Sequence, residues 1–428
     1  MTEPVTELEK AGVCAPAFAC LLDANFSRIG FPIYCKRLQT LLIELSTLTL
    51  ESPQRSLQSG CWFKLICGAS YQALPDVRNL SLAYSLAGAD CIDVAADPSV
   101  ISAAKEGLQA AENFAREKDC AFDRPWLMAS ISAGEDPHFR KAWFDAAICP
   151  ADCLRPCERI CPAAAIDSTG IIRDRCYGCG RCLPICPYGL IEVRSQPTKI
   201  DEIAQQVLSQ VDALEIHTHV GQLAEFAQLW RTIEPWTKEL KLISVSCPDG
   251  ENYVAYLRSL HNIIESPIRT DTGTDTYTNI CTSTSIHKPL VMWQTDGRPM
   301  SGDIGKGTTH AAIKLAQKVL SSNLEGYVQL AGGTNQYTVS KLDALGWLNH
   351  RPVRCPPDNL SGEVSQSISK RSGRPFVSGI AYGSFARRLL APTIEQIAYL
   401  EADPQRLQIA LRLAKSLVDP LKRFALLG

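Results

Sequence analysis

The chain has 428 residues, of which 46% are hydrophobic and 21% charged, and its formal net charge is −2. This length can bury at least one large core, and the charge balance argues against nucleic acid as the main partner. The longest apolar stretch near the start is too short for a membrane span, and no signal peptide precedes it. We therefore expect a cytoplasmic protein without transmembrane segments.

The first 57 residues show little pattern. Four leucines between residues 38 and 45 lie at helical spacing and predict one amphipathic helix. The cysteines of this stretch have no metal-like spacing. We assign residues 1–57 no function.

Residues 58–148 alternate between apolar strands and helices. The predicted strands are 62–68, 91–96 and 125–132. The predicted helices are 75–86, 98–118 and a third that ends near residue 144. Strands that are apolar throughout are typical of parallel sheets covered on both faces.

Eight of the 18 cysteines lie in two runs within residues 149–194. The second run has the spacing Cys-x2-Cys-x2-Cys-x3-Cys-Pro of a bacterial-type ferredoxin. Its members are Cys176, Cys179, Cys182 and Cys186. The first run also ends in Cys-Pro, but its first two gaps hold three residues instead of two. Its members are Cys149, Cys153, Cys157 and Cys161. The two runs predict a two-cluster ferredoxin-like module with an internal repeat.

In such modules the fourth cysteine of each run binds the cluster of the other run. One 4Fe–4S cluster would thus be bound by Cys161, Cys176, Cys179 and Cys182. The other, 4Fe–4S or 3Fe–4S because its run is stretched, would be bound by Cys149, Cys153, Cys157 and Cys186. Structural zinc and disulfides are the alternatives. Only the second run has zinc-like Cys-x2-Cys pairs, and zinc does not require proline after both fourth cysteines.

Residues 195–428 resume the alternation. The predicted strands are 214–220, 240–246, 289–295, 327–331 and 376–381. The predicted helices are 200–211, 223–233, 253–264, 308–320, 338–345, 393–399 and 404–425. Eight strand–helix units in total predict an α/β fold, a TIM-barrel-like closed barrel into which the ferredoxin-type (α+β) module is inserted. A ninth candidate strand at 144–149 leaves an open doubly wound sheet as the alternative.

Glycine-rich turns follow the last strands and form a second candidate site. In a barrel such loops hold phosphate on backbone amides, which would suit flavin mononucleotide (FMN) or a phosphorylated ligand. The candidate residues are Gly302, Gly305, Lys306, Gly332, Gly333 and Gly383, with Arg387 and Arg388 as further positive charges. Neither P-loop nor dinucleotide-binding spacing is met, and glycines that permit tight turns are the alternative.

Polar residues also interrupt the apolar strands. His217 and His219 are two apart on one predicted strand and should share a face with Glu215. We favour a hydrogen-bonded interior pair over a metal or acid–base role. Four aspartates flank strand ends or the glycine-rich turn, but sequence alone places no pair of them. They are Asp90, Asp93, Asp296 and Asp303.

Three segments together with the cysteine module resemble the cyanobacterial light-dependent period protein family. The segments are Trp62-Phe-Lys-Leu-Ile-Cys-Gly-Ala-Ser70, residues 88–97 and residues 296–308. The resemblance runs from about residue 58 to the end. It implies an iron–sulfur protein that feeds light, through cellular redox state, into the circadian clock. It also implies Kai clock proteins and an input histidine kinase as partners.

Our leading hypothesis is a redox sensor or electron-transfer regulator whose clusters exchange single electrons with photosynthetic carriers or quinone. The module has six arginines against five acidic residues, which favours fixed relay over free shuttling. One alternative is a ferredoxin-coupled barrel oxidoreductase that binds flavin or a phospholigand. The other is a scaffold whose clusters are structural.

Overall fold

The computed structural model describes residues 52–135, 139–195, 200–265, 288–297, 306–349 and 376–424. Residues 50–428 form one compact unit. The leucine helix expected within residues 38–45 lies outside the described residues, as do Gly302, Asp303 and Gly305. No helix in the described part of the chain is long and apolar enough to cross a membrane.

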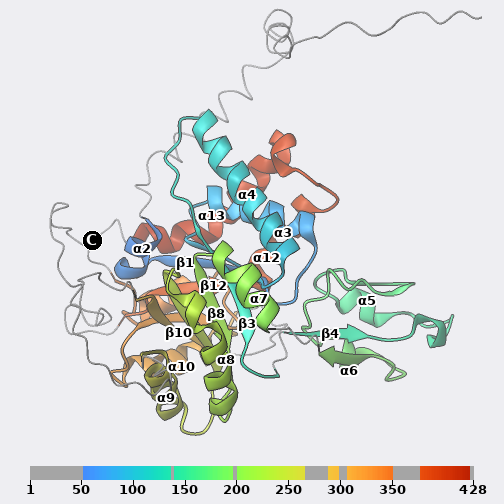
Figure 1. Ribbon diagram of the computed structural model, residues 1–428. Coiled ribbons are helices and arrows are strands. Elements are labelled where there is room, and N and C mark those ends of the chain that lie inside the picture. The colour runs from blue at the N-terminus through green and yellow to red at the C-terminus, as the bar shows by residue number, and fades with distance from the viewer. Residues whose placement is uncertain are drawn as a thin grey trace, which may run out of the picture. The chain divides into compact units, whose positions relative to one another are not determined.

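Eight parallel strands close into a barrel with helices around it (Figure 1). The strands are β1 (Trp62–Gly68), β2 (Cys91–Ala95), β3 (Trp126–Ser132), β8 (Ala213–His217), β9 (Leu242–Pro248), β10 (Leu290–Asp296), β11 (Tyr327–Ala331) and β12 (Gly379–Tyr382). Each strand pairs with the next along the chain, and β12 pairs with β1 to close the barrel. The TIM-barrel-like prediction is therefore confirmed, and the open doubly wound sheet is wrong.

Most of the helices follow a barrel strand, as expected of βα units, whereas the first described helix precedes the first strand. They are α2 (Pro53–Ser59), α3 (Leu74–Leu86), α4 (Pro98–Glu117), α7 (Ile200–Val207), α8 (Leu223–Thr237), α9 (Tyr253–Glu265), α10 (His310–Leu320), α11 (Thr338–Ala344), α12 (Ser384–Ile394) and α13 (Pro404–Phe424), with short 3-10 turns η3 (Leu208–Gln210) and η4 (Leu400–Ala402). The start of α4 shows how an Asp-Pro sequence begins a helix. The Asp97 carboxylate accepts the backbone N–H groups of Ser99 and Val100 at 2.8 and 3.2 Å, and proline occupies the first turn.

Three expected elements are wrong. The helix expected to end near residue 144 is replaced at its end by strand β4 (Arg140–Trp143), which pairs antiparallel with β7 (Glu192–Ser195). The candidate ninth strand at 144–149 contains a 3-10 turn, η2 (Ala146–Ile148). The helix expected at 393–399 does not form, because α12 starts earlier, directly after Gly383, and ends at Ile394. Residues 140–143 form a strand because they pair with the distant segment β7, and the local sequence pattern does not show such pairing.

The amino-terminal end of the barrel is closed by apolar side chains. The core there consists of Leu57, Trp62, Cys91, Trp126, Met128, Ala213, Leu242, Met292 and Tyr327. The indole rings of Trp62 and Trp126 meet edge to face with centroids 5.4 Å apart. This packing leaves the polar interior residues to the middle and the carboxyl-terminal half of the barrel.

The cysteine module leaves the barrel after β3 and returns to it before α7. Besides β4, η2 and β7 it contains α5 (Pro156–Ile160), the hairpin β5 (Ile166–Asp167) and β6 (Gly170–Ile171), and α6 (Cys182–Ile185). Two contacts join it to the loop after β1. The buried Lys141 ammonium donates to Gln72 Oε1 at 2.7 Å, and the Gln72 N–H donates to Asp174 O at 2.8 Å.

Candidate iron–sulfur centre and barrel site

The two cysteine runs repeat each other in backbone conformation. Arg155 and Gly180 stand two residues before equivalent cysteines, and both have positive φ, +46° and +73°. Ala164 and Gly189 stand three residues after the final cysteines, and both are again left-handed, at +46° and +63°. Such angles are rare for arginine and alanine. The structure therefore keeps the repeated turns even where the first run lacks glycine.

Four thiols line one small cavity of the module. Cys161, Cys176, Cys179 and Cys182 surround it together with apolar residues such as Ala142 and Ile166. Burial raises the pKa of Cys182 to about 12, and the neighbouring thiols of the set add to the shift. The cavity thus brings together one cysteine of the first run and three of the second.

The other four cysteines interact with one another. Partial burial raises the pKa of Cys149, and the thiols of Cys153 and Cys186 raise it further. Burial likewise raises the pKa of Cys157, with Cys186 again contributing. The Cys186 thiol from the second run is therefore close enough to act on Cys149 and Cys157 of the first run.

Backbone N–H groups point at several of the sulfur atoms. Ala142 N donates to Cys176 Sγ at 3.4 Å, Ala165 N to Cys161 Sγ at 3.2 Å, and Arg155 N to Cys153 Sγ at 3.4 Å. Burial acts to raise the pKa of Cys186, but backbone N–H groups of residues 188–191 outweigh it, and the net shift is downward. Donors of this kind stabilise thiolates and tune cluster potentials, so the residues present fit iron–sulfur ligation.

A single metal ion would need its ligands to converge on one point. Among the described residues, no group of three or more His, Cys, Asp or Glu side chains does so. The four ligands of a cubane bind four different iron atoms and need not converge. The two wider cysteine sets are compatible with that geometry.

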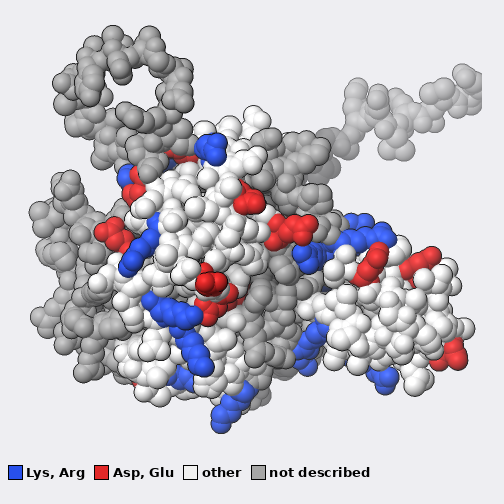
Figure 2. Space-filling model, turned by 90° about the horizontal axis from the view of Figure 1, so that it is seen from below, with Lys and Arg blue, Asp and Glu red and all other residues white. Residues whose placement is uncertain are grey.

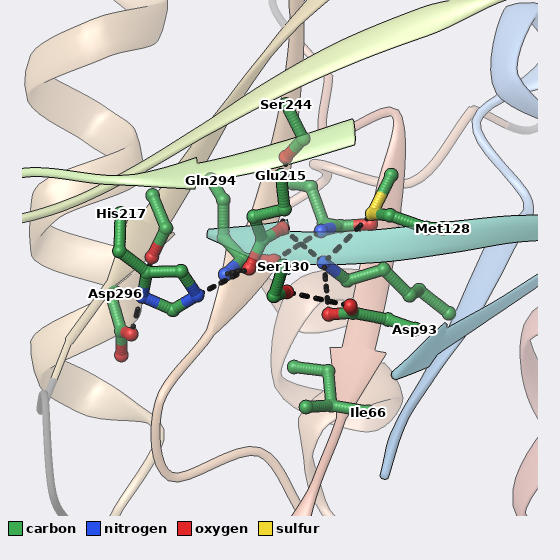
Figure 3. Close-up of polar contacts among 12 residues, drawn as sticks. Ile66, Asp93, Met128, Ser130, Glu215, His217, Ser244, Gln294 and Asp296 are labelled. Carbon is green, nitrogen blue, oxygen red and sulfur yellow. Dashed lines mark hydrogen bonds and ion pairs between the residues drawn. The ribbon is translucent and has the colours of Figure 1, made fainter. Parts of the chain in front are cut away.

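The barrel interior holds a buried ionic cluster (Figure 3). Lys64 on β1 is fully buried and forms ion pairs with Glu215 on β8 and, at 3.2 Å, with Asp93 on β2. Gln294 on β10 donates to Glu215 Oε1 at 2.8 Å, and Ser244 on β9 donates to Glu215 Oε2 at 3.0 Å. Figure 3 shows Asp93, Glu215, Ser244 and Gln294 meeting inside the barrel. One ammonium thus joins strands that are far apart in sequence.

The two carboxylates of this cluster differ in proton affinity. Burial raises the pKa of Asp93, and the nearby charge of Glu215 adds to the shift against the attraction of Lys64. Burial also acts to raise the pKa of Glu215, but Lys64 and His217 outweigh it and lower the pKa to about 2. Ser130 donates to Asp93 at 2.6 Å. As the pH falls, Asp93 therefore takes up a proton before Glu215 does.

The histidine pair predicted on one strand face is wrong. Strand β8 ends at His217, whose Nε2 lies 3.2 Å from Glu215 Oε1 and whose ring packs edge to face on Phe139. His219 lies beyond the strand, with its Nδ1 3.3 Å from Gln222 Oε1. Of the two, His217 alone belongs to the barrel cluster. Asp296 lies at the carboxyl end of β10, where Ser246 donates to it at 3.5 Å.

Among the described glycines of the second candidate site, Gly333 is required by close packing of two loops. A Cβ atom on Gly333 would lie 2.5 Å from Thr308 O, and Thr308 Oγ1 donates to Gly333 O at 2.7 Å. Gly332 also has a positive φ, +70°, and the Lys306 ammonium lies 5.9 Å from the Tyr337 ring centroid. Gly383 directly precedes α12. These contacts explain Gly333 through turn packing.

Sequence reasoning missed Lys64 and its amide and hydroxyl partners. The available signal was a lysine at the centre of an apolar strand, Trp62–Gly68, with polar residues at alternate positions of β9 and β10. Inward-facing positions of a barrel recur every second residue. Applying that period to all eight strands would have collected Lys64, Asp93, Glu215, Ser244 and Gln294.

Comparisons with known proteins cover both parts of the chain. The family model "LdpA Fe-S cluster-binding domain" matches residues 149–197, and the model "Light dependent period A C-terminal domain" matches residues 206–420. The protein "Light dependent period A" of Synechococcus elongatus is 48% identical over 88% of this chain and 95% of its own length.

More distant relatives match the cysteine module alone. "Electron transport protein HydN" of Escherichia coli K12 is 39% identical over 10% of this chain and 26% of its own length. Among solved structures, tryptophan synthase subunit alpha from Legionella pneumophila aligns with 87% of this chain and 98% of its own at 10% identity. Its TM-score of 0.37 supports no conclusion.

Proposed function

Because this chain belongs to the light dependent period A family, we propose that it is a redox sensor that relays light-dependent cellular redox state to the circadian clock. Membership makes it an iron–sulfur protein of the clock-input family. The observation that supports redox sensing is the pair of cysteine sets, each drawn from both runs and each supplied with backbone N–H donors.

One cluster is bound by Cys161, Cys176, Cys179 and Cys182. The other is bound by Cys149, Cys153, Cys157 and Cys186. The first is 4Fe–4S, and the second is 4Fe–4S or 3Fe–4S. When bound, the clusters supply one-electron redox chemistry whose potential is set by hydrogen bonds, charge and solvent exposure.

The residues around the cysteines set the environment in which an electron is held. Phe144, Ile166 and Ile191 are buried in the module core with Cys176 and Cys182 and keep water away from that side. Tyr177, next to Cys176, packs its ring 4.2 Å from the Arg387 guanidinium, which donates to the carbonyl groups at the end of β1. Tyr177 therefore links the cysteine set to Arg387, which is hydrogen-bonded to the barrel. A change of charge at the clusters would act on Arg387 through this contact.

The proposal includes cytoplasmic partners of two kinds. Photosynthetic electron carriers or quinone would exchange electrons with the clusters, and Kai clock proteins with an input histidine kinase would receive the signal. Sensing needs a second arrangement of the chain that differs in partner affinity between redox states. Partner binding compared between oxidised and reduced protein measures that difference.

Iron and acid-labile sulfide analysis of anaerobically purified protein tests the ligand assignment. Cys182→Ser should remove the first cluster and spare the second, and Cys157→Ser should do the reverse. Cys120→Ser is the matched control, because Cys120 lies outside both sets. Protein that is colourless and contains zinc would contradict the proposal.

The buried ionic cluster supports a second candidate, a barrel oxidoreductase. Charged residues inside a barrel cost desolvation energy, and a substrate that binds at the carboxyl ends of the strands could use them. In this proposal the loops near Gly332 and Gly383 would hold FMN or another phosphorylated ligand, and FMN there would take electrons from the clusters and reduce a small substrate. A flavin absorbance spectrum in purified protein would favour this candidate, whereas redox-inert clusters would favour a scaffold.

A further inference from the structure

A cavity of about 240 Å³ lies between the cysteine module and helices α3 and α12. From the module it is lined by the segment that starts at Cys161 and by Arg175 and Tyr177. From the barrel it is lined by Tyr71 after β1 and by residues along the whole of α12, including Arg387 and Arg388. Cys161, one of the four cysteines that line the small cavity of the module, therefore forms part of the wall. Three arginines also line the cavity.

Arg387 is held in place as part of the wall. Its Nη1 donates to Ile66 O at 2.9 Å and to Cys67 O at 2.7 Å. Its guanidinium lies between two aromatic rings, 4.2 Å from the Tyr177 centroid and 5.9 Å from the Tyr71 centroid. This charge is preorganised and needs no rearrangement to face the cavity.

The other two arginines are available to a ligand. Within the described residues, no hydrogen bond or ion pair joins the guanidinium groups of Arg175 and Arg388 to any side chain. Arg175 is half-buried in the module and Arg388 is exposed on α12, so they reach the cavity from opposite sides. Unpaired guanidinium groups that converge on one cavity are suited to bind phosphate or carboxylate in a bidentate manner.

Two carboxylates also line the cavity. Asp76 accepts the Tyr71 hydroxyl at 2.6 Å, and Glu395 is exposed at the far end of α12. Three arginines against two carboxylates leave one excess positive charge. The remaining lining combines apolar residues with two tyrosines, Ser384 and Gln396, so the arginines are the positively charged groups that select an anion.

We propose that this cavity binds a small phosphate-bearing anion through Arg175 and Arg388, with Arg387 as the fixed charge. The site is distinct from the glycine-rich loops and is shared between the barrel and the cysteine module. Its volume suits a phosphomonoester of a few carbon atoms rather than a nucleotide. Because Cys161 forms part of the wall, the bound anion would lie beside the cluster that Cys161 helps to bind.

The cluster-linked part of this inference rests on the proposed function. Reduction adds one negative charge beside the cavity, and like charges repel at close range. The reduced protein should therefore bind the anion more weakly than the oxidised protein, and by reciprocity the anion should lower the midpoint potential. A tenfold difference in affinity corresponds to about 59 mV for a one-electron couple. The protein would then report redox state and phosphometabolite level together.

Isothermal titration calorimetry of the oxidised full chain tests the cavity. The probes are inorganic phosphate, glycerol 3-phosphate, sulfate and malonate at constant ionic strength. Glycerol 3-phosphate should bind best, and Arg388→Gln and Arg175→Gln should each weaken its binding at least tenfold. Arg412→Gln is the control, an exposed arginine on α13 away from the cavity. Equal heats for all four probes, or unchanged binding in Arg388→Gln, would overturn the proposal and leave an adventitious ion only.

A redox titration with and without glycerol 3-phosphate tests the linkage. The anion should lower the potential of the affected cluster in the wild type and leave it unchanged in Arg388→Gln, whose iron content should match the wild type. An unmoved wild-type potential would overturn the linkage. Calorimetry of the oxidised protein needs no electron transfer, so clusters that cannot be reduced would contradict the proposed function and not the binding site.

Discussion

Lys64 shows how one residue can organise a barrel interior. Its ammonium is fully buried and lies between Asp93 and Glu215, which belong to strands on either side of the cysteine module in the sequence. The carboxylates act to raise the pKa of Lys64 and outweigh the opposite effect of its burial. The ammonium is therefore charged at neutral pH.

Removal of this charge should be costly. Lys64→Met leaves two buried carboxylates without their cation, and we expect it to lower the free energy of unfolding by about 3–5 kcal/mol. Lys288→Met, which breaks an exposed pair with Glu265, should change it by no more than about 0.5 kcal/mol. Urea denaturation of both variants measures the difference. Equal stability of the two would show that the interior cluster contributes nothing.

Asp93 should hold a proton at pH values where exposed aspartates have lost theirs. Its folded pKa is raised from 3.8, so the stability from its protonation is present below 3.8 and is lost as pH rises through the folded pKa. Infrared spectra should show a protonated carboxyl C=O band above pH 3.8 that Asp93→Asn removes. A band unchanged in Asp93→Asn would assign the proton to another group.

Ala164 and Gly189 occupy equivalent left-handed positions of the two cysteine runs, so opposite substitutions can be compared at these two sites. Gly189→Ala adds a Cβ that meets nothing within 4 Å, so its cost of about 1 kcal/mol comes from backbone strain alone. Ala164→Gly relieves the same strain at the equivalent position and should leave stability unchanged or slightly higher. Urea unfolding of the cluster-loaded variants compares them. A destabilising Ala164→Gly would refute the equivalence of the two turns.

At the scale of elements, helix α13 closes the barrel unit through one buried ion pair. Lys422 Nζ contacts both carboxylate oxygens of Asp90, at 2.7 and 2.6 Å, and donates to Ser56 on α2 at 2.9 Å. Asp90 also accepts the Phe63 N–H at 2.7 Å. The last helix is thereby joined to the start of β2, to β1 and to α2.

Lys422→Met should loosen α13 and α2 together. A buried carboxylate without its partner costs about 3–5 kcal/mol, and the elements it joins should open more often. Hydrogen exchange should become faster in α2 and α13 but not in α9. Lys318→Met, which breaks an exposed pair with Asp249, is the control. Unchanged exchange in α13 would show that its packing alone holds it.

The sequence predicted the elements that depend on local pattern. All eight barrel strands were identified because buried parallel strands are continuously apolar, and α4 was identified from its Asp-Pro start. The β4–β7 pair was missed because its strands are separated by the whole cysteine module and are held by pairing. The Lys64 cluster was missed because its members lie on five different strands. They become a group only when the inward-facing residues of all these strands are compared.

The cysteine ligand spacing was visible in sequence, whereas its contacts with the barrel were not. Arg387 was noted only as a possible phosphate contact, yet it donates to the end of β1 and packs on Tyr177. Lys141 donates both to Gln72 Oε1 of the barrel loop and to Arg173 O of the module. Such contacts depend on how an inserted module docks, which no local pattern encodes.

At the scale of the whole molecule, the module is an insertion whose two ends, β4 and β7, pair with each other. On the face drawn in Figure 2, acidic and basic side chains are interspersed over the described residues. Contacts at Gln72, Tyr177 and Arg387 join the module to the barrel. This arrangement places the cysteine module against the end of the barrel strand that carries Lys64.

The most direct test of redox sensing is an anaerobic redox titration of the full chain, followed by electron paramagnetic resonance and optical spectra. We predict two reversible iron–sulfur signals at physiological potentials, one lost in Cys182→Ser and the other in Cys157→Ser. The line shape of the second signal separates a 3Fe from a 4Fe cluster. Protein with no reducible iron–sulfur signal would contradict the account.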